Sequence, residues 1–108
     1  MAFDEALAAR IRQGVGQLKG MEEKKMFGGV GFLLKGNMLV GVWKDSLIAR
    51  LGPDEAGAAL SEPYVRVFDI TGRPMKGWVL VDPAGVEGDR LGNWIERAVK
   101  FVRTLPAK

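Results

Sequence analysis

The sequence predicts an α+β fold, a two-layer sandwich in which long helices at both ends of the chain pack on one antiparallel sheet. Apolar residues recur at helical spacing near both termini, and β-rich segments with short turns fill the middle. A short helical segment divides these strands into two groups. The expected order is α-β-β-β-α-β-β-α, in a single domain covering residues 1–108.

The first helix is expected over residues 4–19. Its apolar positions recur at steps of three or four residues, which places them on one helix face: Phe3, Leu7, Ile11, Val15 and Leu18. Asp4 and Glu5 begin it, where the helix dipole favours acidic side chains, and Gly20 is a stop signal.

A β-hairpin follows, because two apolar runs flank Gly36-Asn37, a pair that tolerates the positive φ angles of a two-residue turn. This loop would pair Phe32 with Gly41. One face of the hairpin would then carry Val30, Phe32, Leu34, Leu39 and Trp43. The other would carry Leu33, Met38, Val40 and Val42. Both faces are apolar, so the second needs a cover, from the short helix or from a second subunit.

The remaining elements alternate between strands and helices. Strands are expected at 46–51, 64–70 and 75–82, and a short helix at 53–62 begins with a proline followed by two acids. A final helix starts near Asp89, and its apolar positions follow a regular helical stripe: Leu91, Trp94, Ile95, Ala98, Val99 and Val102.

Composition excludes several kinds of chemistry. The chain has no cysteine and no histidine, so it lacks the usual zinc ligands, a thiol nucleophile and a Ser–His pair. We therefore expect a protein that is not an enzyme and that holds no cofactor or metal. There is no apolar run long enough to span a membrane and no secretory signal, which predicts a cytoplasmic location.

The stretch KKMFGGVGF, residues 24–32, raises the question of a phosphate-binding loop. A dinucleotide fingerprint requires a helix after its glycines, and a Walker loop requires Gly-Lys-Ser/Thr. Neither is present, since a strand follows instead. We interpret Gly28 and Gly29 as a turn into the sheet, and Gly31 as a site of close packing or a bulge.

Two segments carry a family resemblance: KKMFGGVGFLLKGNMLVGVWKDSLIARLG, and GRPMKGWVLVDPAGV followed by the helix of Trp94. They resemble the TfoX N-terminal domain family, also called TfoX/Sxy, over roughly residues 24–102. The signature positions are Met26, Phe27, Gly28, Gly29, Gly72 and Pro74. The resemblance implies a secretion-chaperone-like α+β fold.

Full-length members of that family regulate bacterial natural competence and carry a second, helical domain at the C-terminus. This chain looks like a short stand-alone member without that domain. The resemblance implies a regulatory-accessory role and supplies no catalytic or cofactor-binding residue.

A candidate binding surface consists of basic residues and one methionine that hairpin tips could bring together: Lys24, Lys25, Arg50, Arg73, Met75 and Lys76. The alternative is that these residues have no binding role and form a turn with solvated charges. The net charge of only +3 and the spread of basic residues along the chain favour this alternative. The expected function is a non-catalytic module that binds an unknown protein partner or forms a homodimer. The alternative is weak nucleic-acid binding through Arg73, Lys76 and neighbouring basic residues.

Overall fold

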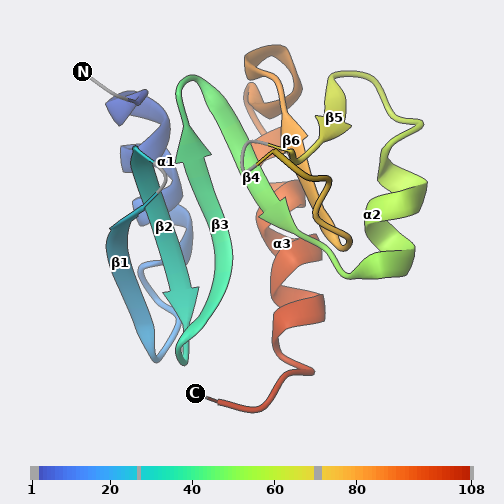
Figure 1. Cartoon of the computed structure of the whole chain (residues 1–108). Helices are drawn as coiled ribbons and strands as arrows, with labels where there is room; N and C mark the ends of the chain where they lie inside the picture. The colour runs from blue at the N-terminus through green and yellow to red at the C-terminus, as the bar shows by residue number, and fades with distance from the viewer. Residues whose placement is uncertain (1–2, 27, 70–71, 108) are drawn as a thin grey trace.

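The computed structural model describes residues 3–26, 28–69 and 72–107. Within these residues the elements follow one another in this order: α1 (Glu5–Val15), β1 (Met21–Met26), β2 (Gly29–Leu34), β3 (Asn37–Trp43), β4 (Ser46–Arg50), α2 (Pro53–Ala59), β5 (Val65–Val67), β6 (Trp78–Val81), the 3-10 turn η1 (Pro83–Val86) and α3 (Arg90–Val102) (Figure 1). The predicted α+β class and the predicted order are confirmed. One strand, β1, is added to them.

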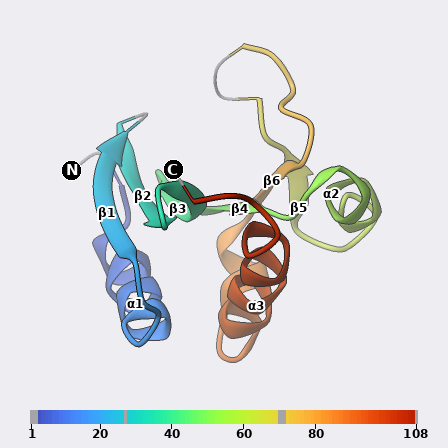
Figure 2. The same ribbon diagram turned by 90° about the horizontal axis from the view of Figure 1, so that it is seen from below.

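The strands form one sheet in the order β1-β2-β3-β4-β6-β5, with every neighbouring pair antiparallel. Figure 2 shows α1 and α3 side by side on one side of this sheet, while residues 72–77, between β5 and β6, rise on the other side. The fold therefore has two layers, as predicted, and the helices cover only one of the two sheet faces.

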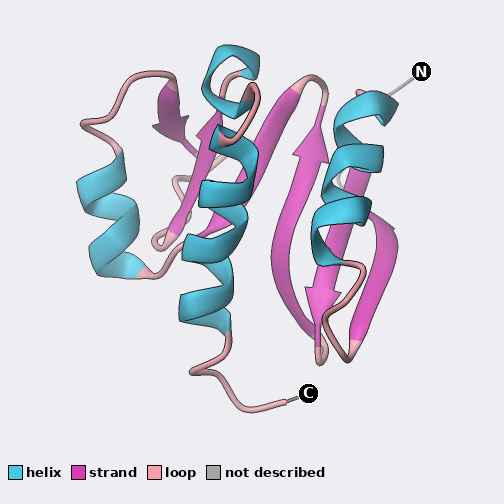
Figure 3. Cartoon of the chain, turned by 180° about the vertical axis from the view of Figure 1, so that it is seen from behind, coloured by secondary structure: helices cyan, strands magenta, loops and turns pink. Residues whose placement is uncertain are grey.

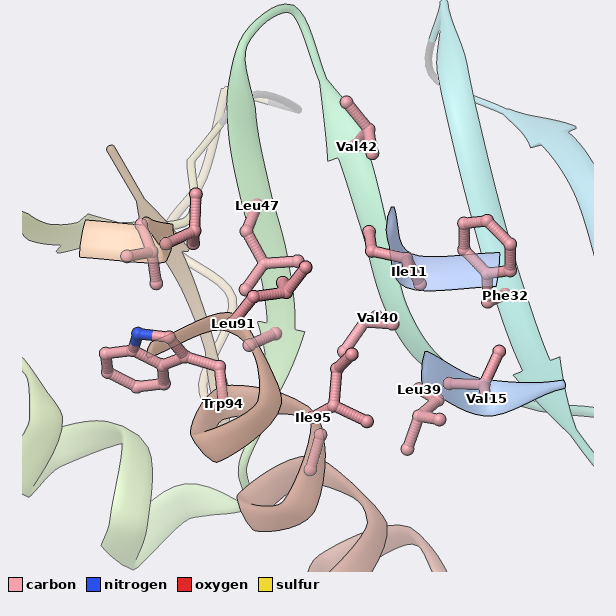
Figure 4. Packing of buried hydrophobic residues seen from close by; sticks show 14 of the residues in the cluster. Ile11, Val15, Phe32, Leu39, Val40, Val42, Leu47, Leu91, Trp94 and Ile95 are labelled. Atoms are coloured by element: carbon pink, nitrogen blue, oxygen red, sulfur yellow. The ribbon is translucent and has the colours of Figure 1, made fainter. Parts of the chain in front are cut away.

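The covered side, here called the helix face, holds the main core. Figure 4 shows α1 and α3 contributing side chains that meet the strands there, among them Ile11, Val15, Leu91, Trp94 and Ile95. The Trp94 indole also donates a hydrogen bond of 3.1 Å to the Gly85 carbonyl, so its one polar group is satisfied within the core. The helical stripes predicted at both ends of the chain are the surfaces that bury this face.

The predicted hairpin register is wrong. The turn residues are Lys35 and Gly36, with φ angles of 52° and 85°, and Asn37 already belongs to β3. Phe32 therefore pairs with Val40 rather than with Gly41. The pairing also shifts between Phe32 and Leu33, which marks a β-bulge.

This register changes the composition of both faces. Val40 and Val42 belong to the helix-face core, where the expected second face of the hairpin had placed them on the opposite side. Trp43 moves the other way and packs with residues of the uncovered side. Shifting the pairing of a strand by one residue moves each side chain to the opposite face of the sheet. The extra residue of a β-bulge makes a second shift of the same kind, so residues on the two sides of the bulge differ in which face they occupy.

Strand β1 was not predicted, because MEEKKM contains no alternating apolar pattern. Four of its six residues are exposed charged side chains. Such a strand suits the edge of a sheet, where charges discourage pairing with another chain. An ion pair also joins β1 to α1, because Arg12 of α1 donates two hydrogen bonds to the Glu23 carboxylate, with both N···O distances at 2.8 Å.

Helix α2 does not cover the uncovered side of the sheet. Its buried residues Ala56 and Ala59 join the helix-face core. Arg97 of α3 holds this helix in place through ion pairs with Glu55 and Glu62, at 3.2 and 2.9 Å. The short helix, one of the two covers expected for the second face, therefore packs elsewhere.

Candidate functional site

The side of the sheet opposite α1 and α3, here called the open face, carries a second apolar cluster. Its members come from β3, β4, β6 and the segment between β5 and β6, and none comes from a helix: Met38, Trp43, Ile48, Phe68, Met75, Trp78 and Leu80. Ile48, Phe68 and Leu80 are buried, whereas the methionines and tryptophans are only half-buried. This side of the sheet thus presents large apolar side chains to solvent.

The segment between β5 and β6 folds back onto the open face. The Met75 amide donates to the Phe68 carbonyl at 2.9 Å, and the Trp78 amide donates to the Met75 carbonyl at 3.2 Å. The Phe68 ring stacks on Trp78 with centroids 5.7 Å apart. These contacts fix Met75 against the cluster and hold the Trp78 ring in one orientation.

Arg50 lies beside this cluster at the end of β4. Its guanidinium carbon is 5.1 Å from the Trp78 ring centroid and 5.8 Å from that of Phe101. Burial lowers the pKa of Arg50, and its side chain makes no ion pair with any residue in the described parts of the chain. A half-buried guanidinium with aromatic rings beside it and no carboxylate is a ready partner for an external carboxylate.

At the other end of the open face, Gly31 and Gly41 pair across β2 and β3 and leave room above the sheet. Methionine side chains occupy the space that two Cβ atoms would take, with Met26 over Gly31 and Met38 over Gly41. Thioether side chains are flexible and polarizable, so they adapt to partners of different shape. Beyond them, the Lys44 ammonium lies 4.7 Å from the centroid of the Trp43 ring.

The structure divides the predicted surface residues into two groups. Arg50 and Met75 both lie at the open face, and Arg73 and Lys76 are exposed in the segment that carries Met75. Lys24 and Lys25 are on β1, the far edge strand, three strand positions from β4.

Three strand spacings amount to about 14 Å. Lys24 also has a partner of its own, since it pairs with Glu22 at 3.6 Å. The two lysines and the other four residues therefore do not form one surface.

The signature positions lie at turns and close approaches of the backbone. Gly28 and Gly72 have φ angles of 74° and 91°, which favour glycine, and Pro74 is exposed. A Cβ at Gly29 would overlap the carbonyl oxygen of Val42. Phe27 lies outside the described residues.

Sequence reasoning found only part of what β3 contributes to the open face. Met38 was correctly placed on the face without the long helices, but Val40 and Val42 were wrongly placed with it and Trp43 on the opposite face, because the turn was set one residue too late. Trp78 was not named among the candidate surface residues. The missing signal was the Lys35-Gly36 turn together with the bulge, since these two features decide which β3 side chains point away from the helices.

The described residues contain no group of three or more Asp, Glu, His or Cys side chains suited to a metal ion. None of the helices in the same residues has the length and apolarity needed to cross a membrane.

Comparison with known proteins gives one match. A family model described as TfoX N-terminal domain matches residues 13–102. No curated protein and no solved structure matches the chain.

Proposed function

The chain belongs to the TfoX N-terminal domain family, and from this premise we propose that it is a non-catalytic module that binds a protein partner through its open face. In this role it acts as an accessory to regulation, in keeping with a family of competence regulators. The single observation that carries the proposal is the apolar cluster of the open face, which no helix of the described residues covers.

The composition of the open face supports a protein partner. Methionine, tryptophan and arginine are enriched where proteins bind one another, and lysine is depleted there. Met38, Trp43 and Trp78 are half-buried around a buried centre formed by Ile48 and Leu80. A buried centre with half-exposed large side chains around it has the anatomy of an interface core.

The placement of basic residues favours a protein over a nucleic acid. A nucleic-acid footprint needs cations gathered along one face. Here Lys24 and Lys25 lie on β1, at one edge of the sheet, while Arg73 and Lys76 lie between β5 and β6, the two strands at the opposite edge. Arg50, which lies 5.1 Å from the Trp78 ring of the apolar cluster, is half-buried and suits one carboxylate better than a phosphate backbone.

The test is affinity capture from the native host with variants that change only the open face. We expect partners retained by the wild-type protein to be lost by Trp43→Ser and by Arg50→Gln. Leu60→Ser is the matched control, because Leu60 is 42% exposed and lies outside the apolar cluster. Equal retention by all four proteins would contradict the proposal.

Two further results distinguish the partner classes. If the open face binds a second copy of the chain, sedimentation shows a dimer that Trp43→Ser converts to a monomer, and the partner is the protein itself. If the captured material is nucleic acid, its retention falls steeply between low and physiological salt and depends on Arg73 and Lys76. That last result would replace the protein-binding proposal with nucleic-acid binding.

A further inference from the structure

A hollow of about 410 Å³ lies at the end of the molecule where three segments meet. These segments are the connection from α1 to β1, the β2–β3 turn and the chain after α3. Its apolar lining consists of Leu18, Leu34, Val102, Leu105 and Ala107, of which Leu34 and Val102 are buried. Asn37 is buried beside them and donates from its side chain to the Pro106 carbonyl at 2.8 Å, which fixes the C-terminal segment as one wall.

Each of the three segments contributes one cation to this hollow: Lys19, Lys35 and Arg103. No acidic residue lines it, and none of the three cations forms an ion pair with any residue in ranges 3–26, 28–69 and 72–107. The negative end of the α3 dipole stabilises the positive charge of Arg103, but it does not stabilise that of Lys35 on the β2–β3 turn. Within the described residues these three cations have no acidic partner, and an anion placed between them offsets the repulsion among their charges.

The position of Lys35 is set by the backbone. Its φ angle is 52°, and its amide donates to the Gly20 carbonyl at 2.8 Å. The turn is thereby fixed to the connection that carries Lys19. This contact keeps the main chains of the two connections near each other before any ligand arrives, while the exposed side chains of Lys19 and Lys35 carry the charges.

A groove between α1 and α3, two helices that run side by side on the helix face (Figure 3), lies next to the hollow. Leu18 and Arg103 line both spaces, so the two spaces adjoin each other. The groove has a volume of about 460 Å³, and its lining combines Gly14, Leu18, Ile95 and Val99 with the charged residues Glu96, Lys100 and Arg103. The combined shape is a channel with an apolar lining, with Lys19, Lys35 and Arg103 around one end and with the exposed Lys100 and Glu96 along the groove.

We propose that this channel is a binding site for an anionic amphiphile. The carboxylate or phosphate head group lies among Lys19, Lys35 and Arg103, and the apolar chain lies in the groove between α1 and α3. This site is separate from the open face, because it is on the opposite side of the sheet. It does not depend on the protein-binding role proposed above.

The test is a titration of the full chain with sodium octanoate, followed by ¹⁵N–¹H NMR. We expect saturable shifts at the amides of Leu18, Leu34 and Val99, and no such shifts with acetate or inorganic phosphate. Octanol should bind more weakly than octanoate, because it lacks the charge that the three cations attract. Shifts of equal size with octanol, or no shifts with octanoate, would overturn the proposal.

Variants locate the head group. Lys35→Asn removes one charge and keeps a residue that tolerates positive φ, and Arg103→Gln removes another. Each should weaken octanoate binding about two- to fivefold, the loss typical of one solvent-exposed ion pair. Arg73→Gln removes the same charge away from the hollow and should leave the affinity unchanged. Equal affinity of all variants would contradict the assignment.

Vesicles distinguish the source of the amphiphile. Co-sedimentation with vesicles of phosphatidylglycerol, lost in Lys35→Asn and Arg103→Gln, would identify a lipid head group and its chain as the ligand. Octanoate binding without vesicle binding would identify a free amphiphile. Vesicle binding that both variants retain, without octanoate shifts, would refute the site.

Discussion

Replacing Gly29 with alanine tests whether the glycines at the start of β2 serve the backbone. The φ angle of Gly29 is not in the left-handed region, so alanine can adopt the same backbone conformation. The obstacle is steric: the new Cβ would overlap the carbonyl oxygen of Val42 on the neighbouring strand. A backbone atom cannot rotate away as a side chain can, so β2 and β3 must separate at this point.

The expected cost follows from the kind of overlap. Forcing one extra carbon into a packed region costs about 1–3 kcal/mol, and a backbone obstacle puts Gly29→Ala near the upper end. Because 1 kcal/mol corresponds to roughly 4–8 °C for a domain of this size, the melting temperature should fall by about 12–24 °C. A loss of about 3 kcal/mol is a large part of the 5–15 kcal/mol that stabilises such a domain.

Urea unfolding followed by far-UV circular dichroism measures this loss, and Gly92→Ala is the control. Gly92 is on α3, and an added Cβ meets no atom within 4 Å. Alanine should therefore stabilise that helix by about 0.5–1 kcal/mol. If Gly92→Ala behaves so while Gly29→Ala lies within about 1 kcal/mol of the wild type, the steric argument is refuted.

Three further changes test the core, an ion pair and a helix cap. Trp94→Phe removes the buried bond to the Gly85 carbonyl, and urea unfolding should show a loss of about 2 kcal/mol; a loss below 0.5 kcal/mol would contradict that bond. The hydrogen bond from Arg12 lowers the pKa of Glu23 below its ordinary value of 4.5. The pair therefore stabilises the fold fully when the pH is above 4.5, and this stabilisation is lost as the pH falls through the lowered pKa. The stability advantage of the wild type over Glu23→Gln should therefore be small at pH 7 and vanish in acid, and an advantage that grows with acidity would have the wrong sign. Asp4→Ala removes the cap of α1, where the carboxylate accepts from the Leu7 amide at 3.1 Å, and should cost about 1 kcal/mol by thermal melting; an unchanged melting temperature would show that the cap does not stabilise α1.

The helices were predictable because their burial pattern is local. The stripe that ends with Ala98 and Val102 on α3 can be found from spacing alone, and these residues are buried in the structure. Helix α1 was predicted too long, since it ends at Val15, with Gly16 as its C-cap. Glycine costs about 1 kcal/mol in a helix interior, and the two glycines at its end outweighed the continued apolar spacing.

The strands were predictable as segments but not in register. Gly36-Asn37 and Lys35-Gly36 are both plausible two-residue turns, and the preference for asparagine and glycine favoured the wrong pair. The structure instead uses Asn37 as a buried strand residue whose side chain binds the Pro106 carbonyl. That contact joins residues 69 positions apart in the sequence, so no local pattern could reveal it.

The candidate site was only partly predictable for a related reason. Arg50 and Met75 were named as residues that hairpin tips could bring together, and the structure places both at the open face. Met38 was placed on the correct face without being named as a binding residue, and Trp43 was placed on the wrong face because its direction depends on the turn and the bulge in β3. The three cations of the hollow come from three separate connections, and only the folded chain brings Lys19, Lys35 and Arg103 together.

A sheet that is covered by helices on one side alone must stabilise its other side by different means. In this protein Ile48, Phe68 and Leu80 are buried there without a third layer, under partly buried residues of β3 and β6 and under Met75. Among these covering residues, Trp43 and Met38 remain half-exposed. Large apolar side chains in contact with water add little to stability, because the gain scales with the area removed from water. A partner that covers them removes that area, and a surface built from methionine and tryptophan gains most from such a contact.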